Sequence, residues 1–280
     1  MVLTPSALSV VIRELENHVG TRLFDRTTRH VSLTPTGAAL LQAAQRSLRE
    51  LDEAIAQIAD ASPAEPPIVA IGAVPLFASS VVPEAIRAFR QLRPNLRYQL
   101  LDADAGVLAG RMAAGTLDVA LGVFLAHMPG IRRTPLFRFS MYAVRSSSRP
   151  NSGRGRLPWT ALKGRTVIAL HPSIPLQGVI DKHLARAGVA DAPRLIVNSF
   201  RTVVAMAEAG EGIGIIPSYW LPVCRERSVV TSRLCQPVLQ LDFHQLRRSG
   251  RRLAPATEEF VTFLQEYCAG WAERSRMHSQ

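Results

Sequence analysis

The sequence predicts an α/β protein that consists of a small N-terminal part, one long helix and two α/β lobes. Three observations lead to this prediction. The first 37 residues read as an amphipathic helix followed by a short hairpin, and the next segment carries a helical heptad repeat. From residue 68 onward, short apolar strands alternate with amphipathic helices. With 280 residues, 47% of them hydrophobic, the chain is long enough to bury a sizeable core.

The N-terminal helix has clear start and stop signals. Thr4 can act as N-cap, Pro5 suits the first helical position, and Gly20 stands where a helix end favours a left-handed residue. Apolar side chains recur at helical spacing and predict one buried stripe: Leu8, Ile12, Leu15 and Val19. The residues on or beside the opposite face are smaller or polar: Ser6, Ser9, Val10 and Arg13. Small polar residues near a helix N-terminus suit a helix that enters a DNA major groove.

A predicted hairpin with basic residues follows, and after it comes the long helix. Between Arg26 and His30 the hairpin offers contacts to a phosphate backbone or a minor groove. The seam of the long helix advances by alternate steps of three and four residues: Leu41, Ala44, Leu48, Leu51, Ile55 and Ile58. This is the pattern of a short coiled coil and predicts a dimerisation linker, the alternative being a helix packed on its own domain. The segment 61–67 then ends the helix and forms an extended hinge.

The remaining sequence predicts two βαβαβ units. In the first, strands are expected over 68–74, 96–101 and 117–123, with helices over 79–92 and 107–114. In the second, strands are expected over 166–170, 194–197 and 213–216, with helices over 176–187 and 201–209. A closing helix is expected over 256–271. The βαβαβ order implies parallel sheets, and ligands bind beyond the carboxyl ends of parallel strands.

Motifs along nearly the whole chain resemble those of LysR-type transcriptional regulators. In the N-terminal part these are Ala7-Leu-Ser, Ile12, Leu15-Glu16, Gly20, Leu23-Phe-Asp-Arg26 and Leu33-Thr-Pro-Thr-Gly37. In the C-terminal part these are Gly72-Ala-Val-Pro75, Gly115-Thr-Leu-Asp118, Pro129-Gly130, Pro135-Leu-Phe137 and Ala209 to Pro217. The resemblance implies an α/β fold: a partial winged helix-turn-helix and a long linker helix, followed by a two-lobed α/β effector-binding domain like type II periplasmic binding proteins.

The domain limits that follow are 1–36 for the partial winged helix-turn-helix, 37–61 for the coiled-coil linker helix, 62–67 for the hinge and 68–280 for the effector-binding domain. Lobe I is expected over about 68–142 and 246–280, and lobe II over about 143–245. The first helix and the supporting helix of the family's motif have no counterpart before Thr4. We therefore expect an N-terminally shortened product, or a reading frame that was assigned from an internal Met.

The resemblance, together with the helix pattern, assigns candidate residues for two ligands. The expected contacts to double-stranded DNA are Thr4, Pro5, Ser6, Ser9, Val10, Arg13, Arg26, Thr28 and Arg29. Arg29 matches the family's wing arginine, whereas Arg26 is equally well explained as a structural residue. The expected contacts to a small-molecule effector are Leu76, Ser79, Asp104, Ser173, Gln177 and Phe200. Ser79 is explained equally well as a helix cap.

Charge and cysteine usage agree with an intracellular regulator. The net charge of +11 suits a polyanionic partner, although nine basic residues and no acid lie in 128–167, outside the DNA-binding segment. Solvated loops would explain that stretch, and an anion-attracting rim would suit a small carboxylate or aromatic acid as effector. The three cysteines have no metal-site or disulfide spacing, and Cys224 with Cys235 is the only candidate redox pair. No membrane span and no signal peptide are evident, so a cytoplasmic location is expected.

The sequence disfavours an enzyme, because no nucleophile-and-base motif, metal cluster or cofactor motif is present. No catalytic residue, metal or cofactor is therefore expected. The expected function is a DNA-binding regulator that acts as a homodimer or homotetramer and responds to a small effector held between the lobes. Two alternatives remain open. One is a truncated subunit that binds ligand but grips DNA poorly and acts as a dominant-negative partner. The other is a solute-binding protein.

Overall fold

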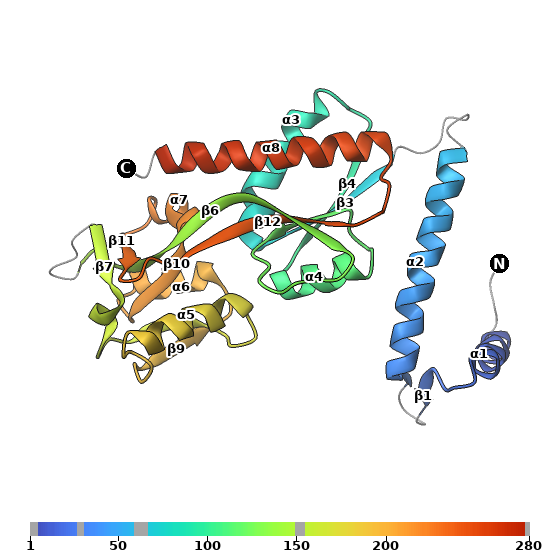
Figure 1. The fold of residues 1–280 in the computed structure, drawn as a ribbon, viewed down its shortest axis with the longest axis horizontal. Coiled ribbons are helices and arrows are strands. Elements are labelled where there is room, and N and C mark those ends of the chain that lie inside the picture. Colours follow the sequence, from blue (N-terminus) through green and yellow to red (C-terminus); the bar gives the residue numbers. More distant parts are fainter. Residues whose placement is uncertain (1–4, 27–30, 59–66, 149–154, 278–280) are drawn as a thin grey trace. The chain divides into compact units, whose positions relative to one another are not determined.

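The computed structural model describes residues 5–26, 31–58, 67–148 and 155–277 (Figure 1). The chain divides into two compact units, Met1–Glu65 and Pro66–Gln280.

The first unit contains two helices joined by a small hairpin. Its elements are α1 (Pro5–Val19), β1 (Phe24–Arg26), β2 (Val31–Leu33) and α2 (Pro35–Ile58). The strands β1 and β2 are antiparallel, with Phe24 opposite Leu33. Gly20 ends α1 in a left-handed conformation (φ 74°), and its N–H donates to the carbonyl of Glu16 at 2.9 Å. The predicted helix, hairpin and long helix are thus confirmed.

One expectation for this unit is wrong. The apolar stripe of α1 is present, but it is not buried, because Leu15 is 43% exposed and Val19 is 39% exposed. Ile12 is half-buried. Among the residues of this unit whose burial the structure describes, Leu23 and Gly37 are the buried ones. Among the described residues, those of the hairpin and α2 leave these side chains of α1 uncovered.

A close approach of backbone segments holds the hairpin against α2. Thr34 caps α2, since its hydroxyl accepts the Gly37 N–H at 2.9 Å and donates to the Arg22 carbonyl at 2.9 Å. Gly37 lies so near Leu23 that a Cβ atom would stand 2.0 Å from the Leu23 carbonyl oxygen. From α1, the carboxylate of Glu16 accepts the N–H groups of Leu23 and Phe24 at 2.8 and 3.1 Å. These contacts explain why the N-terminal motif has a glutamate at position 16 and a glycine at position 37.

The second unit contains two α/β lobes. Lobe I contains the parallel strands β3 (Ile68–Ala73), β4 (Arg97–Asp102) and β5 (Val119–Gly122). Its helices are the π-helical turn η2 (Phe77–Val81), α3 (Val82–Arg90) and α4 (Ala105–Ala113). Lobe II contains the parallel strands β8 (Val167–Leu170), β9 (Arg194–Val197) and β10 (Ile213–Pro217), with helices α5 (Pro175–Arg186) and α6 (Phe200–Glu208). Smaller elements complete lobe II: β7 (Gly155–Pro158), η3 (Trp159–Leu162), η4 (Ser218–Trp220), α7 (Leu221–Cys224) and β11 (Val229–Cys235). Both βαβαβ units are therefore confirmed.

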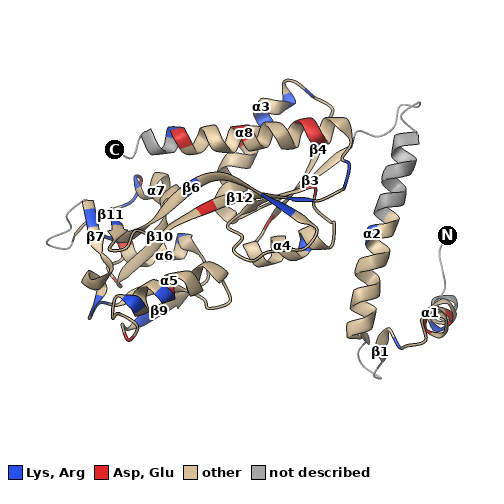
Figure 2. Ribbon diagram, viewed as in Figure 1, with Lys and Arg blue, Asp and Glu red and all other residues tan. Residues whose placement is uncertain are grey.

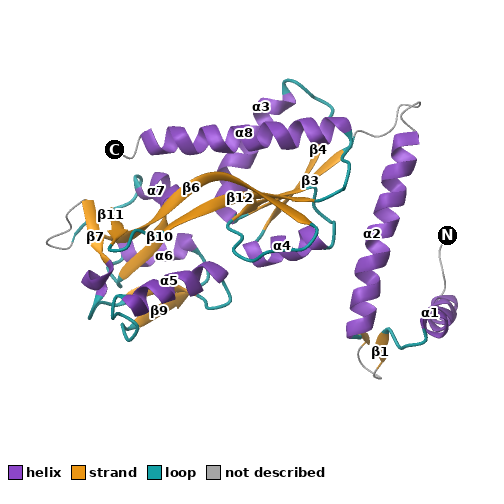
Figure 3. Ribbon diagram, viewed as in Figure 1, coloured by secondary structure: helices purple, strands orange, loops and turns teal. Residues whose placement is uncertain are grey.

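The parallel pairing expected within each βαβαβ unit is confirmed, but the sequence did not predict two antiparallel strands that join the units. Two long strands, β6 (Ile131–Ser146) and β12 (Gln240–Arg248), run antiparallel to each other and join the lobes (Figures 1 and 3). The strand order is β4-β3-β5-β12-β6-β10-β8-β9, so both lobes share one mixed sheet. The first part of β6 pairs with β12 as far as Ser140, and the next part pairs with β10 from Met141. The expected lobe limits at 142 and 246 fall within these two strands.

An aromatic cluster fills the core where β6 and β12, here called the crossing strands, pass from one lobe to the other. The ring of Phe77 stacks on Phe243 at 4.2 Å between centroids and lies 5.9 Å from the ring of Phe137. Tyr219 and Trp271 meet Phe77 edge-on at 6.0 and 5.1 Å. Trp271 belongs to α8 (Pro255–Met277), which lies beside α3 and along β6 (Figure 1). Rings from both lobes and both crossing strands are therefore packed together.

No helix in the described part of the chain is long and apolar enough to cross a membrane.

Candidate functional site

A pocket of about 160 Å³ lies in the second unit, at the carboxyl ends of the six parallel strands. Its lining from lobe I follows β3, β4 and β5: Val74, Pro75, Leu76, Asp104, Ala105 and Val123. Its lining from lobe II comes from the ends of β8, β9 and β10 and the turns that follow: Leu170, Ile174, Pro175, Leu176, Asn198, Ser199, Phe200, Arg201, Tyr219 and Trp220. A ligand in this pocket would touch both lobes, which is the expected place for a ligand in an α/β sheet.

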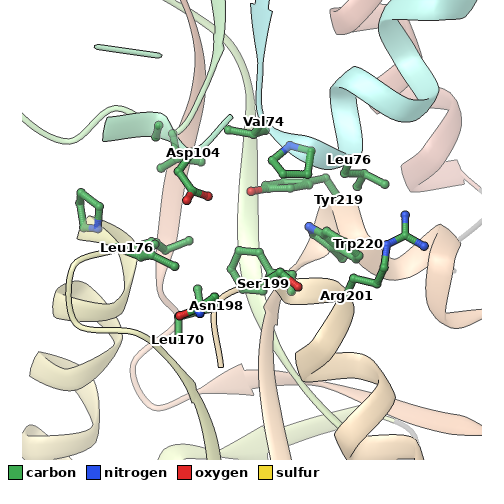
Figure 4. Close-up of a pocket in the computed structure, with 16 residues that line it drawn as sticks. Val74, Leu76, Asp104, Leu170, Leu176, Asn198, Ser199, Arg201, Tyr219 and Trp220 are labelled. Carbon is green, nitrogen blue, oxygen red and sulfur yellow. The ribbon is translucent and has the colours of Figure 1, made fainter. Parts of the chain in front are cut away.

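The lining is largely apolar, with few polar groups. One wall is aromatic, and there the rings of Phe200 and Trp220 lie 5.8 Å apart between centroids. Of the lining residues, Asp104 and Arg201 are the charged ones. In Figure 4 the carboxylate of Asp104 points toward the middle of the labelled side chains, whereas the guanidinium of Arg201 lies on the far side of Trp220. Such a pocket suits a compact, partly apolar ligand.

Tyr219 joins the pocket to the core. Its ring packs edge-on against Phe77, Phe139 and Phe243 at centroid distances of 6.0, 5.1 and 5.4 Å. Burial raises the pKa of the Tyr219 phenol well above its ordinary value, so the hydroxyl stays neutral. The wall that a ligand would touch is therefore continuous with the aromatic cluster at the crossing strands.

Three of the six expected effector contacts line this pocket: Leu76, Asp104 and Phe200. Leu76 directly precedes η2, and Phe200 is the first residue of α6. Asp104 is the N-cap residue of α4, but its side chain makes no capping hydrogen bond. All three stand just beyond the ends of parallel strands, where the βαβ pattern places them.

The other three expected contacts are engaged elsewhere. The hydroxyl of Ser79 donates to the Pro75 carbonyl at 2.8 Å from within η2, so it does not cap a helix. Ser173 is exposed and hydrogen-bonds the Nδ1 atom of His171 at 2.8 Å. Gln177 is buried, and its side chain accepts the Leu170 N–H at 2.8 Å and donates to Asp181 at 2.8 Å. Gln177 thus holds α5 at the end of β8 and supports the pocket wall.

Sequence reasoning missed Asn198, Arg201, Tyr219 and Trp220 as lining residues. Tyr219 and Trp220 follow the expected strand over 213–216 closely. The rule that ligands bind beyond the carboxyl ends of parallel strands, here called the carboxyl-end rule, could therefore have found them. Arg201 was within reach of the same rule, because it stands in the first turn of the expected helix.

The described part of the basic stretch 128–167 supplies no lysine or arginine to the lining of the pocket. Lysines and arginines are instead spread over both lobes (Figure 2). Several of these arginines have partners of their own: Arg133 donates to the Phe124 carbonyl at 2.6 Å, and Arg138 pairs with Asp242 at 3.0 Å.

No described group of three or more His, Cys, Asp or Glu residues could hold a metal ion. The three cysteines are free thiols. Burial raises the pKa of Cys224 and of Cys268 to about 12, while Cys235 is half-buried.

The expected DNA contacts lie in the first unit. Ser9, Val10 and Arg13 are exposed on α1, and Val10 is 55% exposed. Pro5 and Ser6 lie in the first turn of α1, and Arg26 ends β1 opposite Val31. Thr4, Thr28 and Arg29 lie outside the described residues.

Comparison with known families identifies a protein that combines the helix and hairpin of the first unit with the two-lobed pocket of the second. The LysR substrate binding domain model matches residues 66–269, and the bacterial regulatory helix-turn-helix model of the lysR family matches residues 1–38. The chain belongs to the LysR family of transcriptional regulators. It is therefore a DNA-binding regulator with an effector-binding domain, and the family does not consist of enzymes. The helix-turn-helix match decides against a stand-alone solute-binding protein.

Individual relatives agree with this assignment. The HTH-type transcriptional regulator YbhD of Escherichia coli is 26% identical over 267 residues, which cover 94% of this LysR-family chain and 83% of YbhD. The hydrogen peroxide-inducible genes activator of Pectobacterium carotovorum is also 26% identical, covering 95% of this chain and 88% of its own length. Among solved structures, a full-length OxyR variant from Pseudomonas aeruginosa superposes with a TM-score of 0.72 at 18% identity, covering 95% of this chain and 89% of that one. This last match concerns the fold alone.

Proposed function

We propose that the pocket between the lobes is the effector site of this LysR regulator, and that effector binding changes the relation of the two lobes. The observation that carries this proposal is the lining itself, which follows the ends of all six parallel strands and comes from both lobes. A ligand that contacts both walls binds the closed arrangement more tightly than the open one. It therefore shifts the population toward closure.

The effector that we propose is small and partly apolar, and it carries a carboxylate. Arg201 is the cationic side chain among the lining residues. Its guanidinium lies beyond Trp220 in this structure, so it would turn toward the cavity on lobe closure to pair with that carboxylate. Leu76, Asp104 and Phe200 remain proposed contacts. Ser79, Ser173 and Gln177 would act on the ligand only through the turns that they support.

We further propose that the regulator works as a dimer that assembles into a dimer of dimers on a partly palindromic operator. The α2 seam supports this proposal, because Leu41 is 44% exposed and Leu48 is 61% exposed. Two such seams would bury each other in a coiled coil. Lobe closure would then alter half-site spacing. We propose that the DNA contacts act in the cytoplasm, where the chromosome lies. The proposed domain limits are unchanged: residue 36 ends the winged helix-turn-helix, residue 61 the linker helix, residue 67 the hinge and residue 280 the effector-binding domain.

The effector site can be tested by blocking it. Ala105 lines the pocket from α4, so Ala105→Trp should fill the cavity, whereas Val107→Trp alters an exposed position of the same helix that does not line the pocket. Small acids that raise the melting temperature of the unmodified protein should leave the Ala105→Trp variant unaffected and still stabilise the Val107→Trp variant. If the Ala105→Trp variant responds like the unmodified protein, the effector binds elsewhere.

The DNA part is tested separately by fluorescence anisotropy on labelled DNA from upstream of the gene, over a salt series. A stabilising acid should change specific binding in the unmodified protein and have no effect on the Ala105→Trp variant. Leu48→Glu should convert the dimer to a monomer in light scattering and weaken operator binding. A Leu48→Glu variant that remains dimeric would show that the α2 seam is not the interface.

A further inference from the structure

The carboxylate of Asp104 is an unusual wall for a pocket that would take an acid. The side chain lines the cavity and points toward its middle (Figure 4). An N-cap Asp ordinarily accepts an N–H from its own helix, and Asp104 does not do so in α4. Its oxygens therefore remain available to a bound molecule.

No described residue neutralises Asp104 either. Asp104 takes part in none of the ion pairs of the described residues, whereas Asp118, Asp181 and Asp242 each pair with an arginine. Arg201, the other charged lining residue, stands apart from it beyond Trp220 (Figure 4). An effector that closes the two lobes would exclude water from around this carboxylate. Asp104 is exposed to solvent in this structure, so the cost arises only on closure. Burial of the uncompensated carboxylate would then be strongly unfavourable, so closure calls for a positive partner.

The remaining lining favours the same kind of partner. Phe200, Tyr219 and Trp220 form an aromatic wall, and aromatic faces attract cations. Asn198 adds a side-chain carbonyl that can accept a hydrogen bond from an ammonium group. A purely anionic effector would instead meet the like charge of Asp104 inside the closing pocket.

We infer that the effector of this regulator carries a cationic nitrogen that pairs with Asp104. Together with the proposed carboxylate at Arg201, this makes the effector a small zwitterion with an apolar body, such as an amino acid. The inference rests on the proposed function, because it concerns the same pocket.

The test uses three probes that share a phenyl ring and differ in charge: L-phenylalanine, phenethylamine and 3-phenylpropionate. Each is titrated into the full chain by isothermal calorimetry. We expect both nitrogen-bearing probes to bind at least about tenfold more tightly than 3-phenylpropionate, a difference of about 1.4 kcal/mol in binding free energy. Asp104→Asn should abolish that preference. The Arg201→Gln variant should still bind phenethylamine more tightly than 3-phenylpropionate. It should bind the two probes that carry a carboxylate, L-phenylalanine and 3-phenylpropionate, more weakly than the unmodified protein does.

Several results would overturn the inference. Tightest binding of 3-phenylpropionate, or a preference for amines that survives in Asp104→Asn, would show that the Asp104 carboxylate takes no part in ligand binding. If neither L-phenylalanine nor phenethylamine binds, the inferred pairing of a cationic nitrogen with Asp104 is likewise wrong. The Ala105→Trp variant separates this failure from that of the proposed function. If 3-phenylpropionate binds and Ala105→Trp abolishes its binding, the pocket is the effector site and only the cationic partner is wrong.

Discussion

Cys224 and Cys268 are withdrawn from solvent, and Cys235 is only half-buried. This difference matters because relatives of the chain include hydrogen peroxide-inducible activators. The reactive form of cysteine is the thiolate, and burial raises the pKa of Cys224 and Cys268 to about 12. At neutral pH these two thiols are therefore protonated and inert. A redox switch between Cys224 and Cys235 is correspondingly disfavoured.

We predict that Cys235 reacts with iodoacetamide at pH 7.5 much faster than Cys224 or Cys268. The rates can be followed by mass spectrometry of the native protein, with a urea-unfolded sample as the control in which all three thiols react alike. Rapid modification of Cys224 in the native protein, or a Cys224–Cys235 disulfide after peroxide treatment, would restore the redox interpretation.

His244 gives a second prediction at this scale, and it concerns pH. The imidazole lies in β12 and is 8% exposed. Burial lowers its pKa below the ordinary value of 6.5, the neighbouring Arg133 lowers it further, and Asp242 opposes the shift. Since the folded protein then binds fewer protons than the unfolded chain, stability is fully present above about pH 6.5 and declines as the pH falls below that value.

The expected result is that His244→Gln flattens the decline in urea midpoint between pH 7.5 and pH 5. His127 is exposed, so His127→Gln serves as the matched control and should follow the unmodified protein. An unchanged pH profile in the His244→Gln variant would mean that other groups cause the acid sensitivity.

At the scale of single elements, the packing of the hairpin on α2 depends on one missing side chain. A Cβ on Gly37 would lie 2.0 Å from the Leu23 carbonyl oxygen, and the atoms that it would meet are backbone and cannot turn away. Gly37→Ala should therefore push the hairpin off α2, at a cost of about 1–3 kcal/mol. Because the hairpin carries the proposed wing contacts, specific DNA binding should weaken as well.

Hydrogen exchange of peptides covering residues 20–40 measures this effect locally. Gly110 is a helical glycine with nothing within 4 Å of its would-be Cβ, so Gly110→Ala is the control and should stabilise α4 slightly. If Gly37→Ala exchanges no faster than the unmodified protein, the close approach is not essential.

The elements also show which parts of the fold could be predicted. Most helices and parallel strands with unbroken apolar patterns were predicted to within a few residues, and β9 (Arg194–Val197) was predicted with both ends correct. The strands β6 and β12 were not found. Arginines at 132, 133, 138, 145, 247 and 248 interrupt their apolar alternation, since both strands lie partly exposed between the lobes. The carboxyl-end rule found Leu76, Asp104 and Phe200, but whether a serine faces a pocket or bonds to its own turn depends on side-chain geometry.

For the whole molecule, the central feature is the aromatic cluster that unites the two lobes. Phe77 is fully buried and comes from lobe I, Phe137 and Phe243 come from the crossing strands β6 and β12, and Tyr219 comes from the pocket wall. The proposed movement of one lobe against the other would have to be accommodated by these rings, because the shared sheet and the cluster connect the same strands. On the proposed function, we expect a ligand that contacts Tyr219 to affect the strands β6 and β12 through these ring contacts.

Phe77→Ala tests this coupling. Removing a buried ring should lower the free energy of unfolding of the second unit by about 3–5 kcal/mol. The urea transition followed by circular dichroism measures it, and Leu92→Ala, at a side chain that is 65% exposed, should change it by less than about 0.5 kcal/mol. Phe77 does not line the pocket, yet its loss leaves Tyr219 without one of its edge-on partners. We therefore expect the milder variant Phe77→Leu, which keeps the fold, to weaken binding of pocket ligands by several fold. If Phe77→Leu lowers stability and leaves ligand affinity unchanged, the cluster supports the core without connecting the pocket to the crossing strands.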